Sequence, residues 1–255
     1  RLPDLEAVAI CTPPQVRHGI AREALEAGKH VLLEKLSAAT LSELEDLRRF
    51  GERAGRVVFT VWHSQFNRAV DEAQRALQGH EVRRLVVTWK EDVRRWHPGQ
   101  QWIWQPGGFG VFDPGVNALS ILTKILPEPI FLRRAELSFP ENRDAPIAAA
   151  LELAAGRGDE EWRAVFDWRE TGPETWTVEV ETRSGLSLAL TRGGRRLEVG
   201  GQLAAEEDTP EYRGVYARFA TLLDQARSEV DGAPFRLVAD AFLVGRRVVA
   251  GPFED

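Results

Sequence analysis

The sequence lacks several features that mark large protein classes. It contains one cysteine, Cys11, so an intrachain disulfide is impossible, which suits a reducing compartment such as the cytoplasm. No apolar run approaches the ~20 residues that a membrane-spanning helix needs. The net charge is −6 and no basic stripe is present, which disfavours nucleic acid as a partner. We therefore expect neither a membrane protein nor a nucleic-acid-binding protein.

Two kinds of catalytic centre also find no support. The five histidines are scattered without the spacing of metal ligands, and the single cysteine has no partner for a metal site. We therefore expect no metal. No G-x-S-x-G motif is present, so nothing indicates a nucleophilic serine for acyl transfer.

Residues 7–62 alternate between short apolar runs and amphipathic segments. Strands are predicted at 8–11, 30–33 and 56–62, and helices at 18–27 and from Ser37 or Thr40 to about 51–55. This alternation predicts a parallel sheet with right-handed crossovers. Methionine is absent, even at position 1, and the first strand follows almost at once. We therefore expect that the chain begins inside a longer β-α alternation and lacks its true N-terminus.

The pattern changes after residue 62. We predict a helix at 69–77, a half-buried strand at 82–90 and a helix from about 113 to 126. Strands follow at 130–139, 145–154, 161–169, 175–182, 186–191 and 195–199, then helices at 211–228 and 236–249. Glycine-containing turns separate several of the strands, which favours an α+β domain with an open, mostly antiparallel sheet. The 255 residues suffice for one large domain or two.

Residues 89–117 combine polar side chains with tryptophans around a Pro-Gly-Gly turn. Such a mixture is typical of a site for a polyhydroxylated ring, because indole faces pack on the C–H face of a sugar while polar groups bind its hydroxyls. Tryptophans also fill cores, so we expect only one or two of Trp96, Trp102, Trp104 and Trp176 to serve as a sugar platform. The polar residues of the segment that we take as candidates are Glu91, His97, Asp113 and Asn117.

Some of these residues allow a structural interpretation as well as a functional one. Glu34 and Lys35 follow a buried strand, so they either point into a ligand crevice or form a solvated charge pair. Asp113 and Asn117 are four apart and would share one helical face, but Asp113 could also be a helix cap. Glu91 and His97 could be surface loop residues.

Three motifs together resemble one enzyme family. They are A-I-C-T-P-P with a histidine four residues beyond, G-K-H-V-L-L-E-K, and G-G-x-G-x-x-D-x-G-x-N at the start of a helix. They resemble the glucose–fructose oxidoreductase/inositol dehydrogenase (Gfo/Idh/MocA) family of NAD(P)-dependent oxidoreductases. Residues 89–104 and 112–121 are similar to its bacterial aldose 1-dehydrogenases. The glycine-rich G-x-G-x-x-G turn and the ribose selector of that family are absent from this sequence.

The resemblance implies roles for residues at a dinucleotide site. It places Lys35 at the nicotinamide ribose and the reacting hydroxyl, although Leu36 stands where the family has proline. It places Glu34 beside that lysine, and it gives the T-P-x-x-x-H turn to the cofactor. NAD and NADP both remain open, with NADP somewhat favoured. The turn residues are Cys11, Thr12, Pro13 and His18.

The resemblance also implies roles for the polar cluster. The family usually has histidine at position 117 as the acid or base, and asparagine cannot titrate. Proton transfer therefore passes to Asp113, because a carboxylate beside an ammonium can accept a proton. Lys35, Asp113 and Asn117 are then the catalytic residues. The sugar would be bound by Glu91, His97, Trp96, Trp176 and, more weakly, His63.

The resulting prediction is an α/β enzyme that oxidises an aldopyranose of the L-arabinose or D-galactose type at C1 to the lactone. Residues 1–62 would be the rest of a Rossmann domain, residues 63–235 an α+β substrate and oligomerisation domain, and residues 236–255 a helix packed back on the Rossmann part. A homo-oligomer could form through the open sheet. The alternatives are a family member acting on another sugar or carbonyl, and a non-catalytic sensor of sugar or nucleotide.

Overall fold

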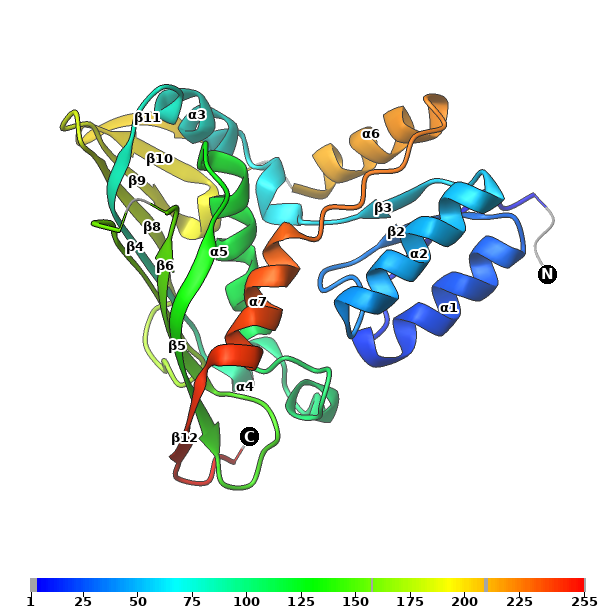
Figure 1. Cartoon of the computed structure of the whole chain (residues 1–255), viewed down its shortest axis with the longest axis horizontal. Helices are drawn as coiled ribbons and strands as arrows, with labels where there is room; N and C mark the ends of the chain where they lie inside the picture. Colours follow the sequence, from blue (N-terminus) through cyan, green and yellow to red (C-terminus); the bar gives the residue numbers. More distant parts are fainter. Residues whose placement is uncertain (1–3, 157, 209–210, 255) are drawn as a thin grey trace.

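The computed structural model describes residues 4–156, 158–208 and 211–254 of the chain. Within these residues lie two β-sheets, a small one of three strands and a large one of nine. Several helices stand between them (Figure 1). None of the helices described is both long enough and apolar enough to cross a membrane.

The small sheet follows the alternation that the sequence predicts. Its strands are parallel and lie in the order β1-β2-β3. Proline stands at the start of α1, where a missing N–H removes no helical bond. A capping box of Thr40 and Glu43 begins α2, and Gly55 in the left-handed region ends it. The elements are β1 (Ala7–Ile10), α1 (Pro14–Glu26), β2 (His30–Leu33), α2 (Leu41–Ala54) and β3 (Val58–Thr60). The predicted Rossmann-type unit is confirmed.

The large sheet begins after a short 3-10 helix, η1, and is mostly antiparallel, as predicted. Its order is β11-β10-β9-β8-β4-β7-β6-β5-β12, and among the described strands of this sheet only β4–β7 and β5–β12 pair in parallel. The elements are η1 (His63–Phe66), α3 (Arg68–Leu77), β4 (Val82–Lys90), α4 (Val93–Trp96), η2 (Gln101–Trp104), α5 (Phe112–Ile125), β5 (Phe131–Pro140), β6 (Ala148–Ala154), β7 (Glu161–Asp167), β8 (Thr175–Thr182), β9 (Ser187–Thr191), η3 (Arg192–Gly194), β10 (Arg196–Val199) and β11 (Gln202–Glu206). The edge strand β11 was not predicted, because its side chains are largely exposed and show no apolar alternation.

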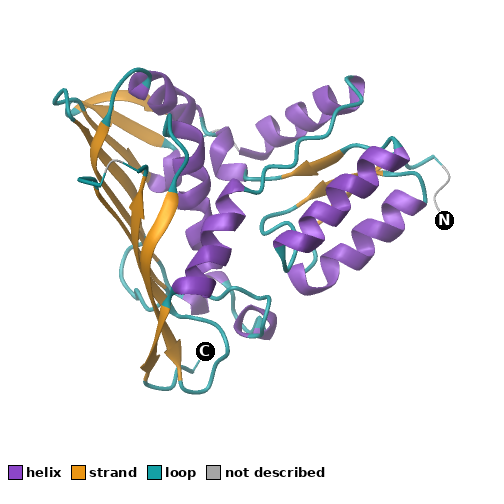
Figure 2. Cartoon of the chain, viewed as in Figure 1, coloured by secondary structure: helices purple, strands orange, loops and turns teal. Residues whose placement is uncertain are grey.

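One face of the large sheet carries helices α3, α5 and α7, and no helix among the described residues covers the other (Figure 2). The main apolar core lies between the sheet and these helices. Helix α5 runs through the middle of this layer, and eleven of its fourteen residues are buried. The start of α5 is therefore held in place between the two sheets. The candidate polar residues of segment 89–117 lie in the same region.

A helix from late in the chain covers the second face of the small sheet. Helix α6 (Glu211–Asp224) packs Val215, Phe219 and Leu222 against side chains of β2 and β3. After α6 the chain pairs beside β3, with Glu229 in parallel register to Phe59. Residues 211–231 thus return to the small sheet. From the sequence, residues 236–255 were expected to pack back on the small-sheet part instead.

The predicted final helix, residues 236–249, is wrong at its end. Helix α7 (Ala233–Val244) stops at Gly245, and strand β12 (Arg246–Ala250) pairs in parallel with β5. A Cβ at Gly245 would lie 2.3 Å from the carbonyl oxygen of Ala241, so only glycine allows this close turn from helix to strand. Most of α7 packs on α5 and β5, and its start reaches α2 beside Leu41.

Candidate active site

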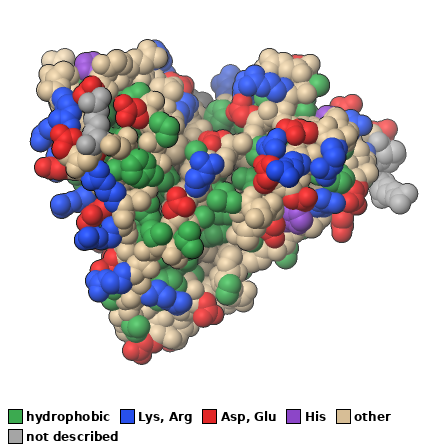
Figure 3. Space-filling view, viewed as in Figure 1, with side chains coloured by type: hydrophobic (Ala, Val, Ile, Leu, Met, Phe, Trp, Pro, Cys, Tyr) green, Lys and Arg blue, Asp and Glu red, His purple; other side chains and the backbone are tan. Residues whose placement is uncertain are grey.

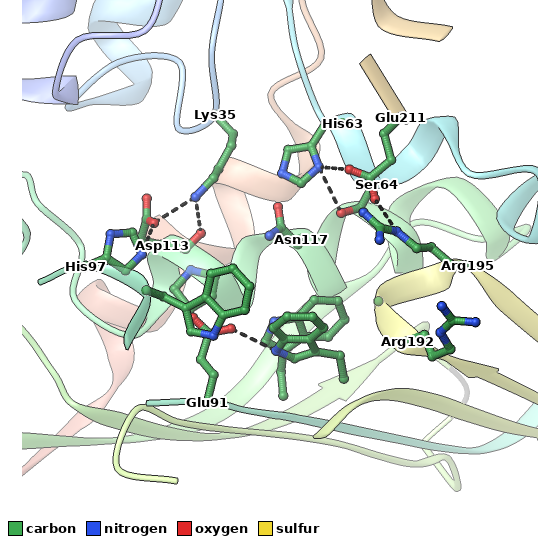
Figure 4. A pocket seen from close by; sticks show the side chains of 15 residues that line it. Lys35, His63, Ser64, Glu91, His97, Asp113, Asn117, Arg192, Arg195 and Glu211 are labelled. Carbon is green, nitrogen blue, oxygen red and sulfur yellow. Dashed lines mark hydrogen bonds and ion pairs between the residues drawn. The ribbon is translucent and has the colours of Figure 1, made fainter. Parts of the chain in front are cut away.

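Lys35 reaches the centre of the molecule from the carboxyl end of β2. Its amine donates to the Oδ2 atom of Asp113 at 2.8 Å and to the backbone oxygen of Asp113 at 2.8 Å. Ligands of parallel α/β sheets gather beyond the carboxyl ends of the strands, which is where the sequence placed this lysine. The two catalytic candidates, one after β2 and one at the start of α5, therefore meet directly (Figure 4).

The glycine-rich turn before α5 fixes the position of Asp113. A Cβ at Gly108 would lie 2.1 Å from the backbone oxygen of Trp102, and one at Gly110 would lie 2.2 Å from that of Pro146. Larger residues would push the turn away from both segments. The backbone N–H of Asp113 donates to Gly110, so the acid enters the helix with its backbone bonded and its side chain free for Lys35. Asp113 is only 4% exposed.

Asn117 lies one turn after Asp113 on the same helix and lines the same cavity. Within the described part of the chain, no hydrogen bond to its side-chain amide is found. An amide that faces a cavity without a protein partner is available to a ligand. A hydrogen bond from that ligand would also offset the desolvation cost that a buried polar group otherwise carries.

His97 also faces the carboxylate of Asp113. Its Nε2 atom lies 3.3 Å from Oδ2, and its Nδ1 atom lies 3.3 Å from Gln100. Burial lowers the pKa of His97, and Asp113 opposes this by raising it. The same carboxylate oxygen thus accepts a hydrogen bond from Lys35 and lies close to the ring of His97.

Glu91 is buried at the end of β4 and held by two indoles. Trp168 donates to Oε1 at 3.2 Å and Trp176 donates to Oε2 at 2.8 Å. Burial raises the pKa of Glu91 to about 7, and the two indole hydrogen bonds counteract that shift only in part. The group is therefore poised to change protonation near neutral pH.

This environment predicts how Glu91 affects stability without ligand. Because its folded pKa lies above the ordinary value of 4.5, its contribution is fully present below about pH 4.5 and is lost as pH rises through about 7. We expect wild type to lose roughly 3 kcal/mol of stability over that window relative to Glu91→Gln. Urea unfolding at several pH values, followed by tryptophan fluorescence, measures the difference. The exposed Glu128→Gln is the control. Parallel pH curves for wild type and Glu91→Gln would contradict the assignment.

A cavity of about 340 Å³ opens in front of these residues. Three tryptophans form one wall: Trp176 lies 5.4 Å from Trp96 and 6.0 Å from Trp89 between ring centroids. Trp96 is 43% exposed, so its ring is available to a ligand. The cavity is lined by Lys35, His63, Ser64, Trp89, Glu91, Trp96, His97, Asp113, Pro114, Asn117, Trp176, Arg192, Gly193, Arg195 and Glu211. All predicted sugar-binding residues line it, including His63.

A second cavity of about 440 Å³ lies along the carboxyl ends of β1 and β2. It shares Lys35, His97 and Asp113 with the first cavity, so these three side chains stand where the two meet. We call it the dinucleotide cleft. Its other lining residues are Ala9, Cys11, Thr12, Pro13, Arg17, Leu32, Glu34, Gln100, Trp102, Tyr212 and Tyr216. A notch between the two parts of the molecule is visible in Figure 3.

The residues of the cleft fit a dinucleotide. The hydroxyl of Thr12 is buried without a hydrogen-bond partner, and α1 begins beside it with no side-chain cap. An uncapped helix N-terminus favours an anionic group such as a phosphate. Glu34 accepts the hydroxyl of Tyr212 at 2.8 Å and the backbone N–H of Lys35 at 3.1 Å, which fixes the loop that carries the lysine.

Some predicted site residues lie elsewhere. His18 pairs with Asp46 of α2 at 2.8 Å and is not among the residues that line the cleft. Trp104 is 3% exposed and packs on Trp168 in the core, whereas Trp102 belongs to the cleft. Groups of three or more potential metal-binding side chains are not found within the described residues.

Sequence reasoning missed Arg17, Glu211 and Tyr212. Arg17 is 3% exposed and donates to the backbone oxygens of Thr12, Glu34 and Leu36, so it joins the turns after β1 and β2. Burial lowers its pKa to about 10. A signal was present, because Arg17 falls on the buried stripe of α1 with the residues three before and four after it. Glu211 and Tyr212 gave none, since His63 and Glu34, with which they hydrogen-bond, lie more than 140 residues away.

Comparison with known proteins agrees with this architecture. Residues 1–62 match the model of an oxidoreductase family with an NAD-binding Rossmann fold. The chain is 42% identical to galactose 1-dehydrogenase of Pseudomonas fluorescens, over 99% of this chain and 81% of that protein. The crystal structure of D-galactose-1-dehydrogenase from Rhizobium etli superimposes with a TM-score of 0.93 at 48% identity, covering 99% of this chain and 80% of that one. A 3-ketoreductase from Actinomadura kijaniata reaches 0.81 at 17% identity over 97% and 80%, a likeness of fold alone.

The small parallel sheet, the cleft at its strand ends and the adjoining polar cavity define a two-part oxidoreductase of the Rossmann type. The chain belongs to the glucose–fructose oxidoreductase/inositol dehydrogenase (Gfo/Idh/MocA) family, as its motifs indicated.

Proposed function

We propose that this protein is an NAD(P)-dependent aldose 1-dehydrogenase that oxidises a galactose-type aldopyranose at C1 to the lactone. The observation that carries the proposal is the junction of the two cavities, where Lys35, His97 and Asp113 line both. A sugar on one side and a dinucleotide on the other would meet at these side chains. The two galactose 1-dehydrogenases that resemble nearly the whole chain support the same activity.

In this proposal the chain's own residues move the proton and hold the oxygen. Asp113 accepts the proton of the anomeric hydroxyl, because its Oδ2 atom faces the cavity and is oriented by the amine of Lys35. The amine of Lys35 binds the anomeric oxygen and offsets the negative charge that develops there. The bound nicotinamide cofactor supplies the hydride acceptor.

The remaining cavity residues position the ring. Asn117 offers an unpaired amide, while Glu91 and His97 offer groups that bind hydroxyls. Trp96 and Trp176 provide an aromatic wall for the C–H face of the sugar. Such positioning matters because reaction needs the anomeric carbon held in one orientation.

The cofactor choice is also part of the proposal. Cys11, Thr12, Pro13 and Glu34 would hold the dinucleotide together with Lys35, and the sequence resemblance favours NADP over NAD. Comparing kcat/KM for the two dinucleotides with the same sugar tests this choice. A lower value for NADP would overturn it.

We further propose a cytoplasmic homo-oligomer built on the open face of the large sheet. The single cysteine supports the cytoplasmic location. The face of the large sheet without helices supports the oligomer. Light scattering of the purified protein measures the oligomeric state, and a monomer at micromolar concentration would contradict it.

A screen of aldoses with NAD and NADP tests the activity itself. We expect reduction of the dinucleotide, followed by absorbance, with D-galactose and to some extent with L-arabinose, which lacks only the outer hydroxymethyl group. Reduction with a different sugar alone would favour another substrate in the family. No reduction with any aldose would favour a non-catalytic sensor.

Replacing Trp96 with alanine tests the aromatic wall. We expect the KM for the sugar to rise roughly tenfold with kcat changed less than about twofold, because the ring contributes binding rather than chemistry. Steady-state kinetics with saturating dinucleotide measure both constants. Phe131→Ala is a matched control, since Phe131 is 45% exposed on β5 and lines neither cavity. An unchanged KM in Trp96→Ala would remove Trp96 from the sugar site.

A further inference from the structure

The first turn of α6 contacts both cavities with two consecutive residues. Glu211 lines the sugar cavity, and Tyr212 lines the dinucleotide cleft. The rest of the helix is anchored on the small sheet through Val215, Phe219 and Leu222. The first turn of α6 is therefore held in place by the later residues of the helix, and the side chains of Glu211 and Tyr212 are not needed for core packing.

Glu211 orients His63 in the sugar cavity. Its Oε2 atom lies 2.6 Å from Nδ1 of His63, and its Oε1 atom accepts the amide of Asn67 at 2.9 Å. Arg195 lies 3.8 Å from Oε1 on the opposite side. Burial would raise the pKa of Glu211, but the hydrogen bond from His63 leads a set of contacts that lower it overall. A carboxylate at this place fixes the His63 ring and leaves Nε2 for a ligand (Figure 4).

Tyr212 acts on the other cavity through Glu34. Its hydroxyl donates to Oε1 of Glu34 at 2.8 Å, and Oε2 of Glu34 accepts the backbone N–H of Lys35 at 3.1 Å. Glu34 is only 9% exposed, so without the phenol one of its oxygens would lose its partner in a largely buried place. The Tyr212 ring also stacks on His63, with centroids 5.7 Å apart and 17° between the planes.

We propose that Glu211 and Tyr212 are two separate positioning residues on one helical turn, Glu211 for His63 in the sugar cavity and Tyr212 for the loop that carries Lys35. Neither needs to touch the reacting atoms. This inference rests on the proposed dehydrogenase function. It adds that Glu211 affects sugar binding and that Tyr212 affects turnover, each independently of the other.

Two conservative variants separate these roles. Glu211→Gln keeps the shape but presents an amide to the donors of Asn67, Arg195 and His63, so we expect the sugar KM to rise roughly tenfold with kcat within about twofold of wild type. Tyr212→Phe keeps the ring on His63 and removes the hydroxyl from Glu34. We expect kcat to fall roughly tenfold with the sugar KM within about twofold.

The control and the alternatives make the test decisive. Arg213→Gln changes the exposed residue that directly follows Glu211 and Tyr212 on α6, and it should leave both constants unchanged. Sugar titration of the dinucleotide-free variants by tryptophan fluorescence should show weaker binding for Glu211→Gln alone. If each variant shifts KM and kcat together and lowers Tm, the turn has only a structural role and the inference is wrong. If wild type oxidises no aldose, the proposed function itself fails.

Discussion

Replacing Asp113 with asparagine is expected to lower kcat for aldose oxidation by about 10³-fold, because proton transfer by a positioned base contributes about 10²–10⁴-fold. The fold should survive the change. Lys35 also donates to the backbone oxygen of Asp113 at 2.8 Å, and that contact does not depend on the carboxylate. Steady-state kinetics with saturating dinucleotide give kcat, and circular dichroism checks the fold.

The remaining activity of Asp113→Asn gives a second measurement. Without the base, the anomeric hydroxyl must lose its proton to hydroxide, so we expect the residual rate to rise steadily with pH. Asp224→Asn, an exposed change of the same type at the end of α6, should keep wild-type kinetics. A kcat for Asp113→Asn within tenfold of wild type would show that another group accepts the proton.

Replacing Lys35 with alanine is expected to lower kcat/KM for the sugar by about 10²–10³-fold. The variant removes the ammonium that binds the anomeric oxygen and leaves Asp113, which is 4% exposed, without its closest cation. The KM for the dinucleotide should rise too, because Lys35 lines both cavities.

Chemical rescue distinguishes the charge of Lys35 from its packing. Added methylamine should restore part of the activity of Lys35→Ala, since a small cation can occupy the space that the side chain leaves. Lys29→Ala, at the opposite end of β2, provides a matched control and should neither lose activity nor respond to the amine. Full activity of Lys35→Ala without any amine would exclude the role assigned to Lys35.

Local patterns predicted most of the fold because local physics determines those elements. Strands β2, β4 and β8 have the predicted bounds. Thr40, one of the two residues proposed as the N-terminal cap, caps α2. The pattern failed where long-range pairing decides the structure. β12 is a strand because β5 offers it a parallel edge, and its sequence follows α7 without a helix-stopping proline.

The candidate site was predictable where a motif stands at an element boundary. Lys35 lies two residues after the end of β2 and Asp113 lies in the first turn of α5, so both were expected at the cleft, and the structure brings them within 2.8 Å. His18 was assigned to the cofactor from the family turn, but its position on α1 directs it to Asp46. Glu211 and Tyr212 could not be found, because no spacing in the sequence relates them to His63 and Glu34.

The return of residues 211–231 to the small sheet has a consequence for synthesis of the chain. Leu32, Val57 and Phe59 are buried on that face by α6, while all three precede residue 60 of the chain. A chain growing from its N-terminus therefore exposes this apolar face until residue 224 has emerged from the ribosome. The three-stranded sheet is therefore synthesised well before the helix that covers it, and chaperone contact during translation should concentrate on that face.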